Sequence, residues 1–183
     1  MISPFPGFAS PAAGFEQPFE MLEACHERLR RSLALLDRLI RHIDEGGHDT
    51  SSRAAAGDVL RYFDLAAPAH HLDEERHVFP LLLAQGDAAA ASTVHELVRD
   101  HQRFVALWAL LRGPLAAWAG GDKAAVSAAT RESAAEFLAL HATHLQREDE
   151  LVFPVAMKLA DAETQARMGA EMQARRRAPA SRG

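Results

Sequence analysis

The chain has 183 residues and a net charge of −5, with 48% hydrophobic and 25% charged residues. These values suit one globular domain, and the acidic balance argues against nucleic-acid binding. The N-terminus lacks the basic and apolar regions of a signal peptide, no stretch approaches a membrane span, and Cys25 is the only cysteine. We therefore expect a cytoplasmic protein without disulfides and without contact with a membrane.

Apolar spacing and turn residues divide most of the chain into four long helices. Residues 1–17 are rich in proline and phenylalanine and predict an irregular arm. Pro18 suits the first turn of a helix, which should extend to about Glu45. Turns that contain glycine or aspartate then separate three more helices, which are expected over about 51–84, 89–119 and 123–160. Ser51 or Ser52 is the expected N-cap of the second helix.

The short turns imply that helices adjacent in sequence are antiparallel neighbours. The predicted fold is therefore all-α, an up-down-up-down four-helix bundle over residues 18–160. Residues 161–183 should add a short helix over 162–177 and a disordered basic tail that begins near Arg175. Four prolines lie inside the expected helices and should kink them: Pro68, Pro80, Pro114 and Pro154.

Two stretches of the chain share the pattern His-x-x-x-Glu-x-x-x-x-Phe-Pro. One begins at His70 and contains Glu74, and the other begins 74 residues later at His144 and contains Glu148. A histidine also occurs in the helix that precedes each stretch, at His26 in the first half and at His101 in the second. The chain therefore reads as two similar helix pairs.

The turns predict that the four histidines of this repeat lie in one layer of the bundle. Two residues of antiparallel helices have the same height when the turn lies midway between them. The midpoints of successive histidine pairs fall at residue 48, between 85 and 86, and between 122 and 123, all within or next to expected turns. Glu74 and Glu148 follow one helical turn later on the same faces. The layer should lie toward the bundle end where the arm begins.

Four imidazoles and two carboxylates in one layer indicate a metal site. Burying two bare carboxylates would cost several kcal/mol each without a compensating cation. This donor set suits iron, manganese or zinc. Two carboxylates can bridge two metals, each of which then takes two histidines. With a bridge derived from solvent, one coordination position on each metal would stay open.

Two other assignments use some of the same residues. His71 and Glu75 repeat the four-residue spacing, but the equivalent positions in the second half are Leu145 and Asp149, which favours His70 and Glu74. Glu75 and Asp149 are then surface groups or groups that orient the ligands. A ferritin-like site needs Glu-x-x-His on two helices. That spacing occurs at Glu23/His26 and Glu74/His77, both in the first half, and has no counterpart in the second.

On these motifs, residues 18–160 resemble the hemerythrin-like, or HHE cation-binding, domains. The resemblance implies a bundle that holds two non-haem irons with a bridging oxo or hydroxo species. It also implies O2, NO or peroxide as the small ligand, or sensing of iron and redox state, with a possible protein partner or electron donor. The positions that match the metal ligands of the family are His26, His70, Glu74, His101, His144 and Glu148.

The sequence departs from the oxygen-carrying hemerythrins at one ligand. Those proteins have a fifth histidine one turn from the histidine of the third helix, where this chain has Leu97 and Val105. His141 or His77 could substitute for it. The departure argues against reversible oxygen carriage. The sequence thus predicts a di-iron protein that binds or senses O2, NO, iron or redox state, or alternatively a redox enzyme that consumes peroxide or nitrogen oxides.

Overall fold

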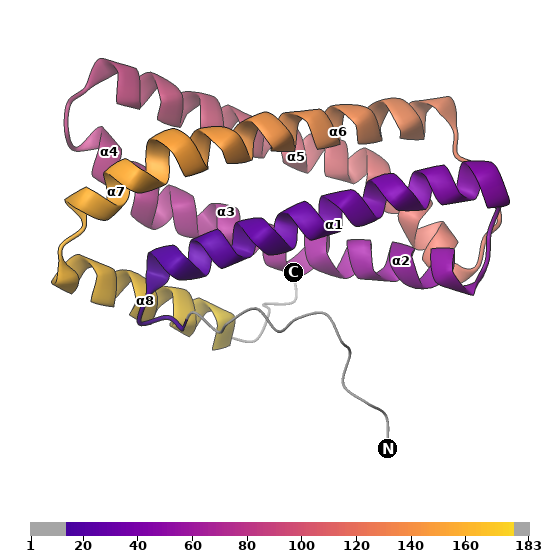
Figure 1. The fold of residues 1–183 in the computed structure, drawn as a ribbon, viewed down its shortest axis with the longest axis horizontal. Coiled ribbons are helices and arrows are strands. Elements are labelled where there is room, and N and C mark those ends of the chain that lie inside the picture. Colours follow the sequence, from indigo (N-terminus) through magenta and orange to yellow (C-terminus); the bar gives the residue numbers. More distant parts are fainter. Residues whose placement is uncertain (1–13, 178–183) are drawn as a thin grey trace.

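The computed structural model describes residues 14–177, which form an antiparallel bundle of four long helices with an additional helix at one end (Figure 1). This confirms the predicted all-α class. The first and third bundle helices are α1 (Pro18–Gly46) and α5 (Ala88–Gly120). The second consists of α2 (Thr50–Arg61), α3 (Ala67–Asp73) and α4 (Phe79–Leu83), and the fourth of α6 (Ala128–Arg147) and α7 (Phe153–Leu159). Helix α8 (Ala162–Arg177) follows.

Two predicted helix starts were wrong. Asp49, rather than Ser51 or Ser52, is the N-cap of α2, because its carboxylate accepts the Ser52 backbone N–H at 2.7 Å. The Ser52 hydroxyl accepts the Asp49 N–H in return, which completes a capping box. The fourth bundle helix begins at Ala128 rather than near residue 123, since Ser127 caps it through the Thr130 N–H.

Three of the four interior prolines follow a π-helical turn. These turns are Tyr62–Ala66, Glu74–Val78 and Glu148–Val152, and each ends two residues before a proline. In a regular helix, the proline ring would clash with the carbonyl four residues earlier. The extra residue of a π turn relieves this crowding and leaves the helix otherwise continuous. Pro114 lies inside α5 without such a turn. Two of these π turns begin at the glutamates of the repeated motif, Glu74 and Glu148.

The buried apolar side chains form two clusters, with the motif histidines at heights between them. The larger cluster fills the end near the α1–α2 turn and includes Leu36, Leu111 and Phe137. The smaller cluster includes Phe79 and Phe153, together with Met168 and Met172, which α8 contributes. The histidine layer is thus enclosed on both sides by apolar packing, and α8 closes the shorter end.

The helix predicted over 162–177 is present as α8, so the prediction that disorder begins as early as Arg175 was wrong. Arg175 and Arg176 both donate to the buried carboxylate of Asp73, the latter at 2.6 Å. Of the predicted arm, residues 1–13 lie outside the described residues, as do residues 178–183 of the tail. No helix among the described residues is both long and apolar enough to span a membrane.

Candidate metal site

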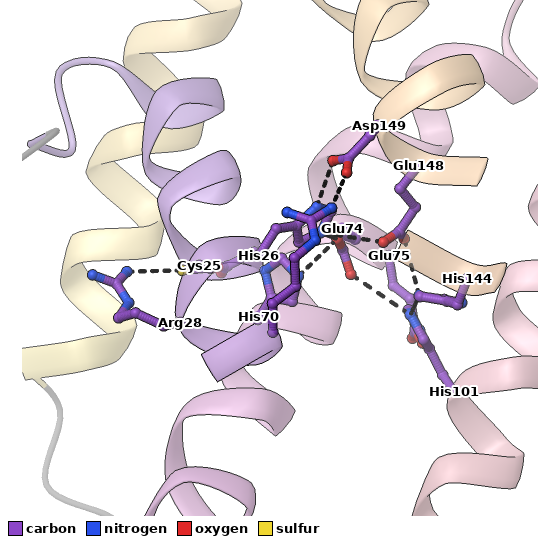
Figure 2. A network of polar contacts seen from close by, with 12 residues as sticks. Cys25, His26, Arg28, His70, Glu74, Glu75, His101, His144, Glu148 and Asp149 are labelled. Atoms are coloured by element: carbon purple, nitrogen blue, oxygen red, sulfur yellow. Dashed lines mark hydrogen bonds and ion pairs between the residues drawn. The ribbon is translucent and has the colours of Figure 1, made fainter. Parts of the chain in front are cut away.

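The six side chains predicted as ligands converge from all four bundle helices (Figure 2). All six are buried, and Glu74 and Glu148 are fully enclosed. The histidines come from α1, α3, α5 and α6, and the glutamates from the two π turns that follow α3 and α6. The layer that was predicted from the turn midpoints is therefore present in the fold. Metal ligation by these six residues remains a prediction.

The donor atoms divide into two groups that share both glutamates. One group contains His26 and His70, and the other contains His101 and His144. Within each group, the donor atoms all lie within 4.8 Å of one another. Two donors of one ion with bonds of about 2.0–2.2 Å are at most about 4.4 Å apart, so a side-chain movement of a few tenths of an ångström brings every donor of a group within reach of one ion.

Each glutamate directs one oxygen toward each group. Glu74 Oε1 lies 3.1 Å from His70 Nε2, whereas Glu74 Oε2 lies 3.6 Å from His101 Nε2. Glu148 Oε2 lies 3.3 Å from His26 Nε2, and its Oε1 lies 3.2 Å from His144 Nε2. This is the arrangement that two carboxylates need to bridge a pair of metals.

Three of the four histidines are oriented by carboxylates outside the donor groups. The Nδ1 atom of His26 lies 2.7 Å from Asp149, that of His101 lies 2.7 Å from Glu75, and that of His144 lies 3.3 Å from Asp100. An Nδ1–H that donates to a carboxylate leaves the Nε2 lone pair directed inward. Metal-binding histidines are commonly held in this way.

Glu75 and Asp149 thus orient histidines, which is one of the two roles expected for them. Each supports a histidine on another helix rather than one on its own. Asp100 was not predicted, and its position directly before His101 gave no indication that it would contact His144. His71, from the alternative register, lies outside both donor groups.

The histidine and glutamate atoms that face the centre of the layer are arranged to bind a cation rather than to hydrogen-bond to one another. His26 Nε2, His70 Nε2 and all four glutamate oxygens are buried without a hydrogen-bond partner among the described residues. The Nε2 atoms of His101 and His144 lie only 3.2 Å apart. Unsatisfied buried acceptors are costly, and when both rings are neutral with their protons on Nδ1 the two Nε2 lone pairs repel. A cation within each group would satisfy these atoms, so the donor set fits metal binding.

Without a metal ion, the two buried carboxylates of the layer can be compensated only by protons bound to the glutamates or to the neighbouring histidines. Burial, and then repulsion by Glu148, raise the pKa of Glu74 to about 8. Burial opposes the charged form of His144, but the Glu148 carboxylate and the hydrogen bond to Asp100 raise its pKa to about 9. Because metal ligation requires deprotonated donors, metal loading should release protons and become tighter as the pH rises.

Neither candidate for a fifth histidine ligand belongs to a donor group. His77 lies under α8, where its Nε2 is 3.3 Å from Arg175 and 3.7 Å from Glu171. His141 is fully buried, and its Nδ1 donates to the Phe137 carbonyl at 2.8 Å. Its Nε2 has no hydrogen-bond partner among the described residues.

His141 should make the metal-free protein sensitive to acid. Burial lowers its pKa to about 3 from the ordinary value of 6.5. Below pH 6.5, the unfolded chain therefore binds a proton that the folded chain excludes, so stability falls as the pH falls toward 3. Between pH 7 and pH 5 we expect this group alone to lower the free energy of unfolding by about 2 kcal/mol.

Urea unfolding at both pH values checks this expectation. His141→Leu should reduce the loss at pH 5 by about that amount. Phe63→Leu changes the same region without changing a titratable group, so it should keep the wild-type pH dependence. Equal losses in wild type and His141→Leu would show that this ring does not contribute.

Comparison with known proteins agrees with the resemblance described above. The profile of the hemerythrin HHE cation-binding domain matches residues 17–156 and, in a second overlapping match, residues 92–177. A relative from Haemophilus influenzae is 28% identical over 164 residues, which cover 90% of this chain and 92% of the relative, and it is described only as an uncharacterized protein. The first profile match spans most of the chain and all six predicted ligands. The chain therefore belongs to the hemerythrin HHE cation-binding family.

Proposed function

We propose that this protein holds two non-haem irons between its four histidines and two glutamates, and that it binds or senses a small oxygen or nitrogen ligand there. The observation that supports this most strongly is the orientation of the glutamates, each of which directs one oxygen toward each donor group. Two imidazoles and two carboxylate oxygens per metal suit iron and, with a bridge derived from solvent, leave an open position on each ion.

A bound pair of irons would supply open coordination positions and up to two electrons. The chain supplies the environment in which these act. Asp149, Glu75 and Asp100 hold three imidazoles in a fixed orientation, so little rearrangement is needed when a ligand arrives. The two apolar clusters and α8 limit the access of water to the layer. Such a dry, pre-organised site suits a small uncharged ligand.

One observation favours the alternative, a redox enzyme that consumes peroxide or nitrogen oxides. Neither donor group contains a third histidine, and Leu97, at one of the two positions where a carrier could have its fifth, is a buried apolar residue. Both metals would then have open positions. A small oxidant could react with either metal, whereas reversible carriage favours one open position.

The first test is iron content, measured together with the absorption spectrum of the anaerobically reduced protein before and after exposure to oxygen. We expect about two irons per chain, as a bridged pair of metals requires. An oxygen-dependent band that disappears on deoxygenation would favour binding or sensing. A single irreversible oxidation would favour the enzyme. A folded protein that binds one zinc, or no metal, would contradict the proposed site.

A further inference from the structure

The sequence repeat pairs each contact around one donor group with a contact around the other. Positions in α1 correspond to positions 75 residues later in α5, and positions in the second bundle helix to positions 74 residues later in the fourth. The hydrogen bond of His26 to Asp149 is therefore equivalent to that of His101 to Glu75, and both measure 2.7 Å (Figure 2). We call the His26/His70 group the first donor group and the His101/His144 group the second. Differences between them can be assigned to particular equivalent positions.

One difference concerns the carboxylates that orient the histidines. Asp100 lies 3.3 Å from the Nδ1 atom of His144 in the second donor group. The equivalent position in α1 is Cys25, which has no carboxylate. The Nδ1 atom of His70 is buried and has no hydrogen-bond partner among the described residues. The first donor group therefore has one imidazole bonded to a carboxylate, whereas the second has two.

A second difference concerns the charge beside the two equivalent hydrogen bonds. Asp149, which orients a histidine of the first donor group, also accepts a hydrogen bond from Arg30. The position equivalent to Arg30 in α5 is Val105. Glu75, which orients a histidine of the second group, has no arginine or lysine partner within residues 14–177. A guanidinium thus offsets the carboxylate of the first group, and the equivalent carboxylate of the second keeps its full charge.

Neighbouring ion pairs add to this difference. Near the second donor group, Arg147 approaches Asp100 only to 3.7 Å and also pairs with Glu96 at 3.5 Å. Near the first group, two arginines of α8 pair with a single carboxylate, that of Asp73. Asp73 is on α3, one turn after His70. The surroundings of the first donor group are therefore more positive than those of the second.

This imbalance bears on the charge of a bound metal. A carboxylate that accepts the Nδ1–H of an imidazole makes that imidazole a stronger donor to a metal. Hydrogen bonds to the ligands and the net charge around them are also among the factors that set the reduction potential of an iron site. More negative surroundings favour the ferric ion, and more positive surroundings favour the ferrous ion.

We propose that the two irons are unequal: when the pair is half reduced, the iron of the second donor group stays ferric and the iron of the first becomes ferrous. Cys25 and Arg30 set this preference. Cys25 leaves His70 without a carboxylate partner, and Arg30 offsets the charge of Asp149. Both residues act through a histidine and are not metal ligands. The inference rests on the proposed di-iron function and adds which iron accepts the first electron.

The test is a stepwise electrochemical reduction of the iron-loaded, diferric protein. Each step adds one electron to one ferric ion, and no bond forms or breaks. Cys25→Asp places a carboxylate at the position from which Asp100 reaches His144. It should lower the potential of the first step by about 59 mV, which is a tenfold change in the equilibrium constant for one electron, and change the second step less. The gap between the two potentials should therefore narrow.

The buried carboxylate of Cys25→Asp has a partner available, because the Arg28 guanidinium lies 3.1 Å from Cys25 Sγ. Two substitutions at exposed positions test the proposal without a buried change. Arg30→Val should lower the first potential, and Val105→Arg, which places a cation at the position equivalent to Arg30, should raise the second. Both should narrow the gap by less than the tenfold equivalent, because charges at exposed positions are screened.

The matched control is Arg41→Val, which removes the same charge from an exposed position of α1. It lies eleven residues, or roughly 16 Å, beyond Arg30 along the helix, so both potentials should stay at their wild-type values. Mössbauer spectra of the half-reduced wild type should show one ferric and one ferrous iron as separate signals. A single averaged signal would overturn the proposal.

The direction of each shift decides the assignment. A wider gap in Cys25→Asp or Arg30→Val would place the ferric ion in the first donor group and would overturn the proposal. An unchanged gap, with both potentials shifted equally, would also overturn it. In either case wild type would still bind two irons, so the proposed di-iron function would stand. A folded wild-type protein that binds no iron would contradict that function, and this inference with it.

Discussion

Replacing Glu148 with alanine should cost the protein both metals, whereas replacing His70 with alanine should cost it mainly one. Glu148 contributes an oxygen to each donor group, and His70 contributes a nitrogen to one group only. Loss of a group that merely orients a ligand weakens metal binding by about 10–100-fold, so loss of a shared ligand should exceed about 100-fold at both positions. Metal analysis after gel filtration, followed by titration of the stripped protein with ferrous ion, measures both effects.

The matched control is His71→Ala, which removes the neighbouring imidazole that lies outside both donor groups. It should keep about two metals per chain if the register assigned to His70 and Glu74 is correct. Circular dichroism should show that the variants stay helical. The Glu148 carboxylate lies 3.3 Å from His26 Nε2 and 3.2 Å from His144 Nε2 and favours the protonated form of both rings, so the metal-free variant should also be less stable than metal-free wild type. Retention of one tightly bound metal by Glu148→Ala would contradict the bridging geometry.

The positions of the predicted metal ligands along the bundle axis could be derived from the sequence, because the calculation needs only the positions of the turns. Each turn position is marked by glycine or aspartate, and one residue of rise is only about 1.5 Å, so errors of one or two residues still placed His26, His70, His101 and His144 in one layer. The repeat then selected the correct face of two helices. The turn residues and the motif spacing can both be recognised within short stretches of the sequence.

The groups that orient the histidines could not be predicted in the same way. Asp149 contacts His26, and Asp100 contacts His144, so each pair joins different helices. Which of two successive polar residues faces a neighbouring helix depends on the rotation of both helices about their axes. Three π turns alter that rotation by adding a residue. The prolines indicated that something changes at these positions, but did not indicate an added residue rather than a kink.

The wrong start predicted for the disordered tail, at Arg175, has a similar cause. Three consecutive arginines followed by small residues and proline are typical of a solvated end. Their role depends on Asp73, which is about a hundred residues earlier in the chain and which sequence alone does not show to be buried. The π turn begins directly after this aspartate, at Glu74. Helix α8 therefore attaches to the bundle next to a predicted metal ligand.

Replacing Arg175 and Arg176 together with alanine should lower the free energy of unfolding by about 3 kcal/mol. Asp73 is completely buried, and both arginines donate to its carboxylate while remaining partly exposed themselves. Breaking a buried pair by removing one side typically costs about 3–5 kcal/mol because the remaining charge has no partner. Because both arginines are partly exposed to solvent, we expect a loss of stability at the lower end of this range. Urea unfolding of the metal-free protein measures it without a contribution from bound metal.

The control within the same helix is Arg167→Ala, whose partner Glu163 lies one turn away on the exposed face. Such a pair contributes only about 0.3–0.5 kcal/mol. A double-mutant cycle with Asp73→Leu then separates the cost of leaving the Asp73 carboxylate unpaired from the loss of side-chain packing between α8 and the bundle. If the unpaired carboxylate causes the loss, adding Asp73→Leu to the double arginine variant should recover most of it, since no buried charge would remain. If the loss persists, the arginines stabilise α8 through packing of their side chains, and the ion pairs with Asp73 contribute little.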